Sequence, residues 1–115
     1  VGLYEPVESR EFRIKILAED FRAAGTAVLD SLAEYAKEQP GWSIAPDNCE
    51  GVRVNLDKAH GDGWFLLRLS LHDPILPLNI ESDREHGART IARQLAPFLA
   101  QQTEIDASSA LEFTL

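Results

Sequence analysis

The chain has 115 residues, a formal net charge of -8 and a pI near 4.7, and 44% of its residues are apolar. This length corresponds to one domain with a single hydrophobic core. Proteins that bind nucleic acids usually carry a basic face, so the acidic balance argues against DNA or RNA as a partner, and likewise against an anionic membrane surface. No segment has the unbroken apolar length of a membrane span, and no signal-peptide pattern follows Val1.

The cysteines, histidines and motifs of the chain limit the kinds of chemical site that it can form. The single cysteine, Cys49, excludes an internal disulfide framework, fits a reducing cytoplasm and is expected to be an inert thiol. The histidines His60, His72 and His86 lack paired ligand spacing, so we expect no metal site. Serine-hydrolase and nucleotide-loop motifs are absent, and no catalytic residue is predicted. The chain contains no methionine, even at position 1, which suggests that it was cut from a longer protein.

The first part of the chain predicts a strand and a helix. Apolar and charged residues alternate from Phe12 to Ile16, which is the period of a half-buried strand. From Phe21 to about Lys37, apolar residues recur every three or four positions, which predicts an amphipathic helix that Pro40-Gly41 ends. Residues 42–48 indicate a connection.

Three further strands are predicted. Val52 to Leu56 alternates, and residues 57–63 contain two glycines that indicate a hairpin turn. Trp64 to Leu69 is apolar at nearly every position, as in a central strand that is covered at least in part on both faces. Leu76 to Ile80 alternates again. Because Pro77 lacks the N–H that a ladder needs, this strand is predicted at an edge of the sheet, or with Pro77 facing outward at its start.

A second amphipathic helix follows. Ser82 and Glu85 have the spacing of a capping box at its start. Pro97 lies within the helical pattern and predicts a kink or an early end, because proline in a helix interior costs roughly 3 kcal/mol. Residues 103–115 show no firm period and are assigned to a tail, open to disorder, although Phe113 could dock.

The order strand, helix, strand, strand, strand, helix predicts the fold class. Helices grouped on one face of a mainly antiparallel sheet form an α+β, two-layer domain. We therefore expect a four-stranded sheet with two helices on one face over residues 1–102.

Several short motifs follow one another along this frame. They are Phe12-Arg13-Ile14, Gly51-Val52-Arg53-Val54, Asp62-Gly63-Trp64, then Arg68, Ser70 and Pro74, and finally Ile80-Glu81. In this order and spacing, residues 3–100 resemble the C-terminal domain of the α-D-phosphohexomutases, the phosphomannomutase and phosphoglucomutase enzymes. The resemblance implies a TATA-binding-protein-like fold.

The resemblance also implies a function for the loop after Arg68. In the family this loop grips the phosphate of a hexose phosphate and helps to close the cleft, which implies phosphate contacts from Arg68, Ser70, Leu71 and His72. The family's phosphoserine and its Mg2+-binding aspartate loop lie in preceding domains, and neither motif is in this chain. The resemblance thus implies a lid domain that is not catalytic alone. Its parent enzyme would be an isomerase that transfers a phosphoryl group within a hexose phosphate, and its partners would be that substrate and the preceding domains.

The loop departs from the family's pattern at four positions. Leu71 stands for a glycine or asparagine, His72 for a threonine, Asp73 for a glutamate and Pro77 for a later arginine. Leucine resists the left-handed backbone that glycine tolerates, and a lost arginine removes a bidentate phosphate clamp. His72 would compensate in part by donating from its ring. The alternative function is a non-enzymatic packing or protein-interaction domain that has lost phosphate binding.

Each candidate residue also has a purely structural interpretation. Arg68 could pair with an acid of the neighbouring strands or turns, Ser70 could cap the turn, and His72 could be an exposed turn histidine. The sequence leaves these alternatives open.

Overall fold

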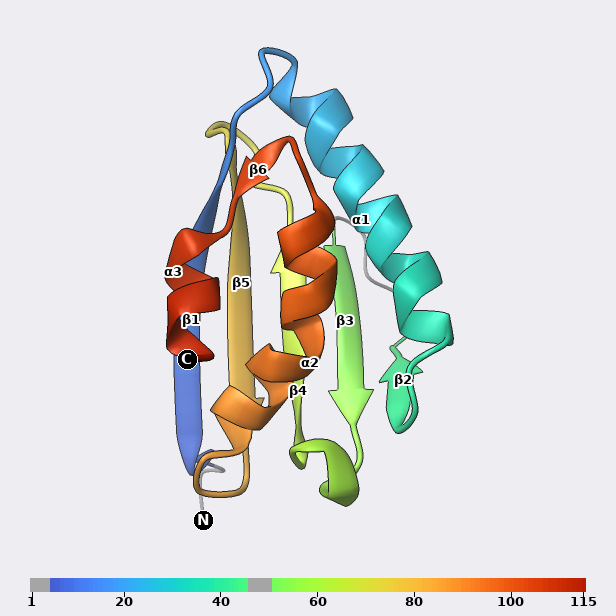
Figure 1. Ribbon diagram of the computed structural model, residues 1–115, viewed down its shortest axis with the longest axis vertical. Coiled ribbons are helices and arrows are strands. Elements are labelled where there is room, and N and C mark those ends of the chain that lie inside the picture. Colours follow the sequence, from blue (N-terminus) through green and yellow to red (C-terminus); the bar gives the residue numbers. More distant parts are fainter. Residues whose placement is uncertain (1–4, 46–50) are drawn as a thin grey trace.

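The computed structural model describes residues 5–45 and 51–115 as an α+β domain with a mostly antiparallel sheet and helices on one face (Figure 1). The strands are β1 (Glu8–Ile16), β2 (Trp42–Ile44), β3 (Gly51–Leu56), β4 (Gly63–Arg68), β5 (Ile75–Ser82) and β6 (Ile105–Asp106). The helices of the described residues are α1 (Phe21–Lys37), α2 (Gly87–Gln101) and α3 (Ser108–Phe113), with one 3-10 turn, η1 (Lys58–His60). Cys49 lies outside the described residues.

The sheet has six strands in the order β2-β3-β4-β5-β1-β6. The predicted α+β class and the placement of the helices on one face are confirmed, but the predicted numbers of four strands and two helices are wrong, because the described residues form six strands and three helices. The additional strands, β2 and β6, lie at the two edges and are three and two residues long. Elements this short contain no complete period, so only their pairing with β3 and β1 reveals them.

The core lies between the sheet and the helices. Inward-facing side chains of the central strands are fully buried, among them Ile14, Phe65 and Leu78. Leu32 of α1 and Leu95 of α2 cover them and are equally buried. Burial of this apolar surface is the main source of stability, at roughly 25 cal/mol per Å².

Pro77 lies in the interior of the sheet, and the edge predicted for its strand is wrong. β5 is flanked by β4 and β1, and Pro77 lies opposite Arg13 of β1. The β4–β5 register ends with the pair Leu67 and Leu78, one pair short of Pro77. The ladder thus stops where the missing N–H would be required.

The start of α2 is capped by an acid from β1. The carboxylate of Glu8 accepts hydrogen bonds from the backbone N–H groups of His86, at 2.8 Å, and Ala88, at 3.1 Å. These groups belong to the first turn of the helix, which begins at Gly87 and leaves its first N–H groups without intrahelical partners. Glu8 thus ties the first long strand to the second long helix.

The capping box predicted for Ser82 and Glu85 is therefore wrong. Ser82 is the last residue of β5, and α2 begins only at Gly87. The hydroxyl of Ser82 is buried and donates to the carbonyl oxygen of Gly61 at 2.6 Å, so it closes the β3–β4 hairpin instead of a helix.

Replacing Glu8 by glutamine should lower the free energy of unfolding by about 1 kcal/mol at neutral pH. The hydrogen bond from His86, more than that from Ala88, holds the pKa of the Glu8 carboxyl below its ordinary value of 4.5, against a desolvation that raises it. Because the folded-state pKa is the lowered one, this stabilisation is present above pH 4.5 and is lost as the pH falls through the folded-state pKa. Urea unfolding at neutral pH and near pH 3 measures the difference.

The exposed acid Glu11, on the same strand, provides the control. Its replacement by glutamine should change stability little at either pH. If the difference in the free energy of unfolding between the wild type and Glu8→Gln stayed the same from neutral to acid pH, the carboxylate cap would not be the cause of that difference.

α2 continues through Pro97 as far as Gln101, so the early end predicted there is wrong. Pro97 is exposed, while Leu95, Phe98 and Leu99 around it are buried. Burial of this apolar face stabilises the last turn by more than the missing hydrogen bond costs.

The C-terminal segment is structured, which corrects the tail expected over residues 103–115. β6 pairs with the end of β1, and α3 follows at once, with the Asp106 carboxylate accepting a hydrogen bond from the N–H of Ser108 at 3.0 Å. Phe113 packs against Phe12 with ring centroids 5.4 Å apart. The segment depends on β1 for these contacts, so its own sequence carries no strong period.

Candidate functional site

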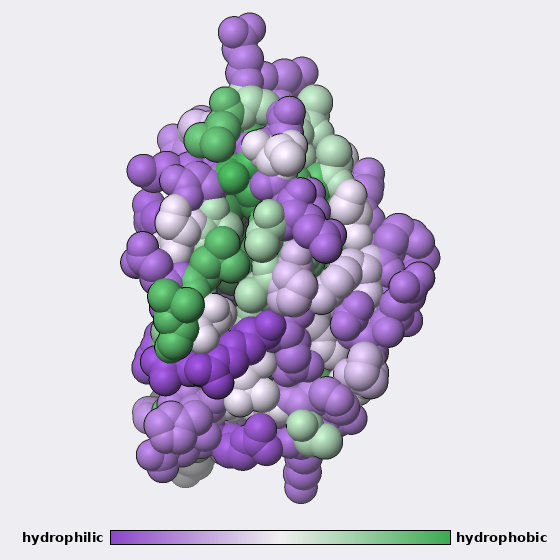
Figure 2. Space-filling view, in the orientation of Figure 1, coloured by the Kyte–Doolittle hydropathy of each residue, from purple (hydrophilic) through white to green (hydrophobic). Residues whose placement is uncertain are grey.

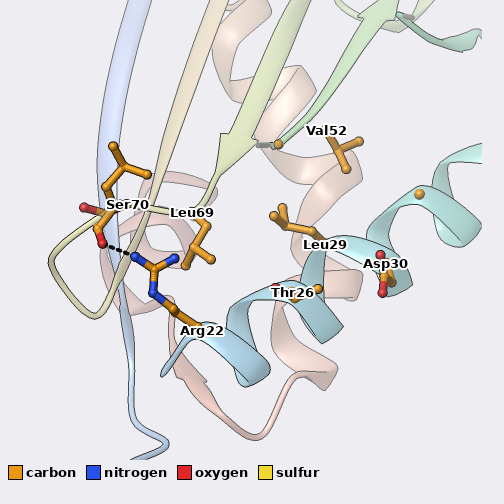
Figure 3. A pocket seen from close by; sticks show the side chains of 10 residues that line it. Arg22, Thr26, Leu29, Asp30, Val52, Leu69 and Ser70 are labelled. Carbon is orange, nitrogen blue, oxygen red and sulfur yellow. Dashed lines mark hydrogen bonds between the residues drawn. The ribbon is translucent and has the colours of Figure 1, made fainter. Parts of the chain in front are cut away.

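The β4–β5 loop lies at one end of the sheet, beside the N-terminal part of α1 (Figure 3). Its base is closed by a hydrogen bond from the N–H of Ser70 to the carbonyl oxygen of Ile75 at 3.1 Å. Within the described residues, no acceptor takes the N–H groups of Leu71 and His72. Two backbone donors at the tip of the loop are therefore available to a ligand.

A pocket of about 370 Å³ lies between this loop, α1 and the start of β3. Its apolar wall is formed by Leu29, Val52 and Leu69, and Ser70 and Leu71 line it from the loop. Besides Ser70, the polar side chains come from α1, and they lie on one face of that helix, at positions 22, 26 and 30.

Arg22 is the cation of this pocket, and it is not among the site residues predicted from the sequence. In Figure 3 its guanidinium points from the start of α1 toward the loop, where it donates to the carbonyl oxygen of Leu71 at 2.6 Å. A guanidinium has five N–H donors, so most of them remain for a ligand. The signal was its place in the first turn of a helix, where the positive end of the helix dipole disfavours a cation.

The pocket is polar at both ends. Arg22 and Ser70 lie at the loop end, whereas Asp30 lies about two turns further along α1, with Thr26 between (Figure 3). The first end offers hydrogen-bond donors and a positive charge, and the second offers a carboxylate that accepts from hydroxyl groups. This arrangement can bind a molecule that carries an anionic group at one end and hydroxyls at the other.

The structure separates the predicted phosphate ligands. Ser70 and Leu71 line the pocket, but Arg68 and His72 do not. Arg68 is the last residue of β4 and follows the fully buried Leu67, so its side chain leaves the sheet on the face opposite the helices. His72 is exposed at the tip of the loop.

Other chemistry-bearing groups are scattered. Within residues 5–45 and 51–115, no cluster of histidine, cysteine or acidic side chains could hold a metal ion. His60 contacts Asp57 at 2.5 Å within the β3–β4 hairpin, and neither residue lines the pocket. Burial raises the pKa of Tyr35, whose hydroxyl donates to the carbonyl oxygen of Gln94. These contacts are structural.

Known proteins do not identify the chain directly: no protein-family model matches it, and a search of curated proteins finds no significant match. Among the helices of the described residues, none has both the length and the apolar character that a membrane crossing requires.

Proposed function

We propose that the chain is the substrate-phosphate-binding lid of an enzyme similar to phosphomannomutase and phosphoglucomutase. The observation that carries the proposal is the pocket in which Arg22 and Ser70 meet at the β4–β5 loop. The short motifs between Gly51 and Glu81 that resemble the phosphohexomutases support this proposal, because their residues fall on the β3–β4 hairpin and the loop that leads into β5. On this proposal the fold is TATA-binding-protein-like.

The chemistry of the pocket favours a hexose phosphate over inorganic phosphate. The Arg22 guanidinium, the Ser70 hydroxyl and the N–H group of Leu71 would hold the phosphate oxygens through charge-assisted hydrogen bonds. Asp30 and Thr26 would accept hydrogen bonds from the sugar hydroxyls. On this proposal Arg22 binds the phosphate, the role that the resemblance to the phosphohexomutases implies for Arg68.

The reaction itself belongs to the rest of the proposed enzyme. The preceding domains would supply the phosphoserine and the Mg2+ site for phosphoryl transfer within the hexose phosphate, and the whole would be cytoplasmic. The lid would contribute binding and exclusion of water, which raise the rate by positioning the substrate.

A packing or interaction domain without a ligand is the second candidate function. It is favoured by the hydrogen bond between Arg22 and Leu71, which uses the cation of the pocket to hold the loop, and by the departure of Arg68 to the other face. On this alternative the pocket would be a by-product of packing.

A matched pair of arginine variants distinguishes the two functions. Titrating the 15N-labelled chain with glucose 6-phosphate or mannose 1-phosphate to millimolar concentration should shift the amide signals of residues 69–73 and of the first turns of α1. Arg22→Gln should weaken this binding on the order of tenfold, the effect of one lost charged hydrogen bond. Arg68→Gln should leave it nearly unchanged, since Arg68 lies on the opposite face of the sheet.

The outcome decides between the functions. If Arg68→Gln abolished binding and Arg22→Gln did not, the ligand would sit on the other face of the loop. If none of these residues shifted with either sugar phosphate, the ligand-free packing domain would be the better account.

A further inference from the structure

The sheet face opposite the helices, here called the open face, is covered by no helix of the described chain (Figure 1). Side chains alternate between the faces of a strand, so the buried residues Ile14, Phe65 and Leu78 fix which neighbours point to the open face. By this alternation the open face includes Glu11, Arg13, Lys15, Arg53, Asn55, Trp64, Leu66, Arg68, Ile75, Pro77, Asn79 and Glu81.

An apolar band crosses the open face. It consists of Trp64 and Leu66 on β4 and Ile75 on the adjacent strand β5, all three partly exposed, whereas Pro77 beside them is buried. A sheet with one face in water normally shows polar residues there. The apolar run of β4 therefore has the composition of a strand covered on both faces, whereas the helices cover only one of them. A partner on this face would cover what remains exposed of Trp64, Leu66 and Ile75.

One end of the band is already arranged for contact. The guanidinium of Arg53 lies over the ring of Trp64, 4.2 Å from its centroid. This cation-π contact holds both side chains in one orientation. Tryptophan and arginine are the residue types that most often dominate the binding energy of protein interfaces. A preformed pair of this kind lowers the entropic cost of docking.

Cations outnumber acids around the band, although the chain as a whole carries a net charge of -8. Arg13, Lys15, Arg53 and Arg68 flank the band, and no ion pair of theirs is found within residues 5–45 and 51–115. The strand register places three acids of the described residues on this face, Glu11, Glu81 and Asp106, and Asp106 lies opposite Lys15. By contrast, the helix side is mainly hydrophilic, with apolar side chains gathered over β6 and α3 (Figure 2).

We propose that the open face docks an acidic surface of a protein partner with an apolar centre. The apolar centre would cover the band, and its acids would pair with Arg13, Lys15 and Arg68. Such an interface has the usual anatomy, an apolar core inside a polar rim. The rim charges would steer association and select the partner by electrostatic complementarity.

A nucleic acid fits the open face less well. Trp64 is the aromatic residue that the strand register of the described residues places on this face, and it is stacked under Arg53 and so is not free to stack on a base. Glu11 and Glu81 would face phosphates at close range, and the whole chain is acidic. The same charges disfavour an anionic membrane.

A synthetic peptide tests the proposal. The probe is an amphipathic helix of leucine and glutamate, and its counterpart carries lysine in place of every glutamate. The acidic peptide should shift amide signals of β4, β5 and β1 in the 15N-labelled chain. Added salt should weaken the binding of this peptide. Arg13→Glu and Leu66→Ser should each reduce the affinity on the order of tenfold.

Each variant has a matched control on another surface. Lys37→Glu makes the same charge change on α1, and Leu71→Ser removes an apolar side chain that is 50% exposed in the loop. Both should bind the acidic peptide as the wild type does. Equal binding of the lysine peptide, loss of binding in the controls, or no shift on the open face would overturn the proposal. Preferential binding of poly-dT or of phosphatidylserine vesicles would overturn the choice of a protein partner.

Neither the band nor Arg13 lines the pocket at α1, so the two proposals stand or fall separately.

Discussion

Phe65→Ala should destabilise the domain by about 3–5 kcal/mol, the range for a fully buried aromatic residue. Phe65 is 0% exposed at the centre of β4, and its ring packs edge-on against Trp42 with centroids 5.2 Å apart. Alanine would remove the ring and leave a cavity that the surrounding strands can close only in part. Since small domains are stable by only about 5–15 kcal/mol, this is a large share of the total.

The measurement is urea unfolding followed by far-UV circular dichroism, because the fluorescence of Trp42 would itself respond to the loss of the neighbouring ring. Leu71→Ala is the control, since Leu71 is 50% exposed and its truncation should cost less than about 1 kcal/mol. A similar loss in both variants would show that the core is not centred on Phe65.

Gly63→Ala is the second large effect, and we expect a loss of about 3 kcal/mol. A Cβ at Gly63 would lie 1.9 Å from the carbonyl oxygen of Glu81 and 2.8 Å from the Cα of Ser82. Both atoms belong to the backbone of β5, which pairs with β4 at this point, so neither can rotate away. Glycine is needed here for the close approach of two strands.

Gly25→Ala is the matched control for this substitution. A Cβ at Gly25 would lie 2.6 Å from Cδ1 of Leu69, the end of a flexible side chain in the β4–β5 loop. Moving that side chain costs little, and alanine gains about 1 kcal/mol of helix propensity inside α1. Thermal unfolding should therefore place Gly25→Ala near the wild type and Gly63→Ala far below it. Equal effects would mean that both glycines act only through chain entropy.

Much of the fold follows from local periodicity. The alternation in Phe12–Ile16 and Val52–Leu56 and the helical stripe in Phe21–Lys37 predict elements that the structure contains. These patterns depend on neighbours a few residues apart, so the chain carries them without reference to the rest of the fold. The α+β class follows from their order.

The candidate site depends on contacts that no local pattern contains. Arg22 and Leu71 are 49 positions apart, and their hydrogen bond exists only because α1 packs beside the β4–β5 loop. Strict alternation would place Arg68 and Ser70 on the same face of a strand. β4 ends at Arg68, however, and the turn redirects Ser70 toward α1.

Local sequence patterns specify the class of the domain, its long elements and the polar loop between β4 and β5, because each is a property of a short segment. Tertiary packing specifies which cation faces that loop, that Glu8 caps a helix 78 positions away, and that Pro77 is tolerated inside the sheet. Strand register accounts for this difference. Pairing between distant segments sets which side chains meet, and one residue of register moves every side chain of a strand to the other face.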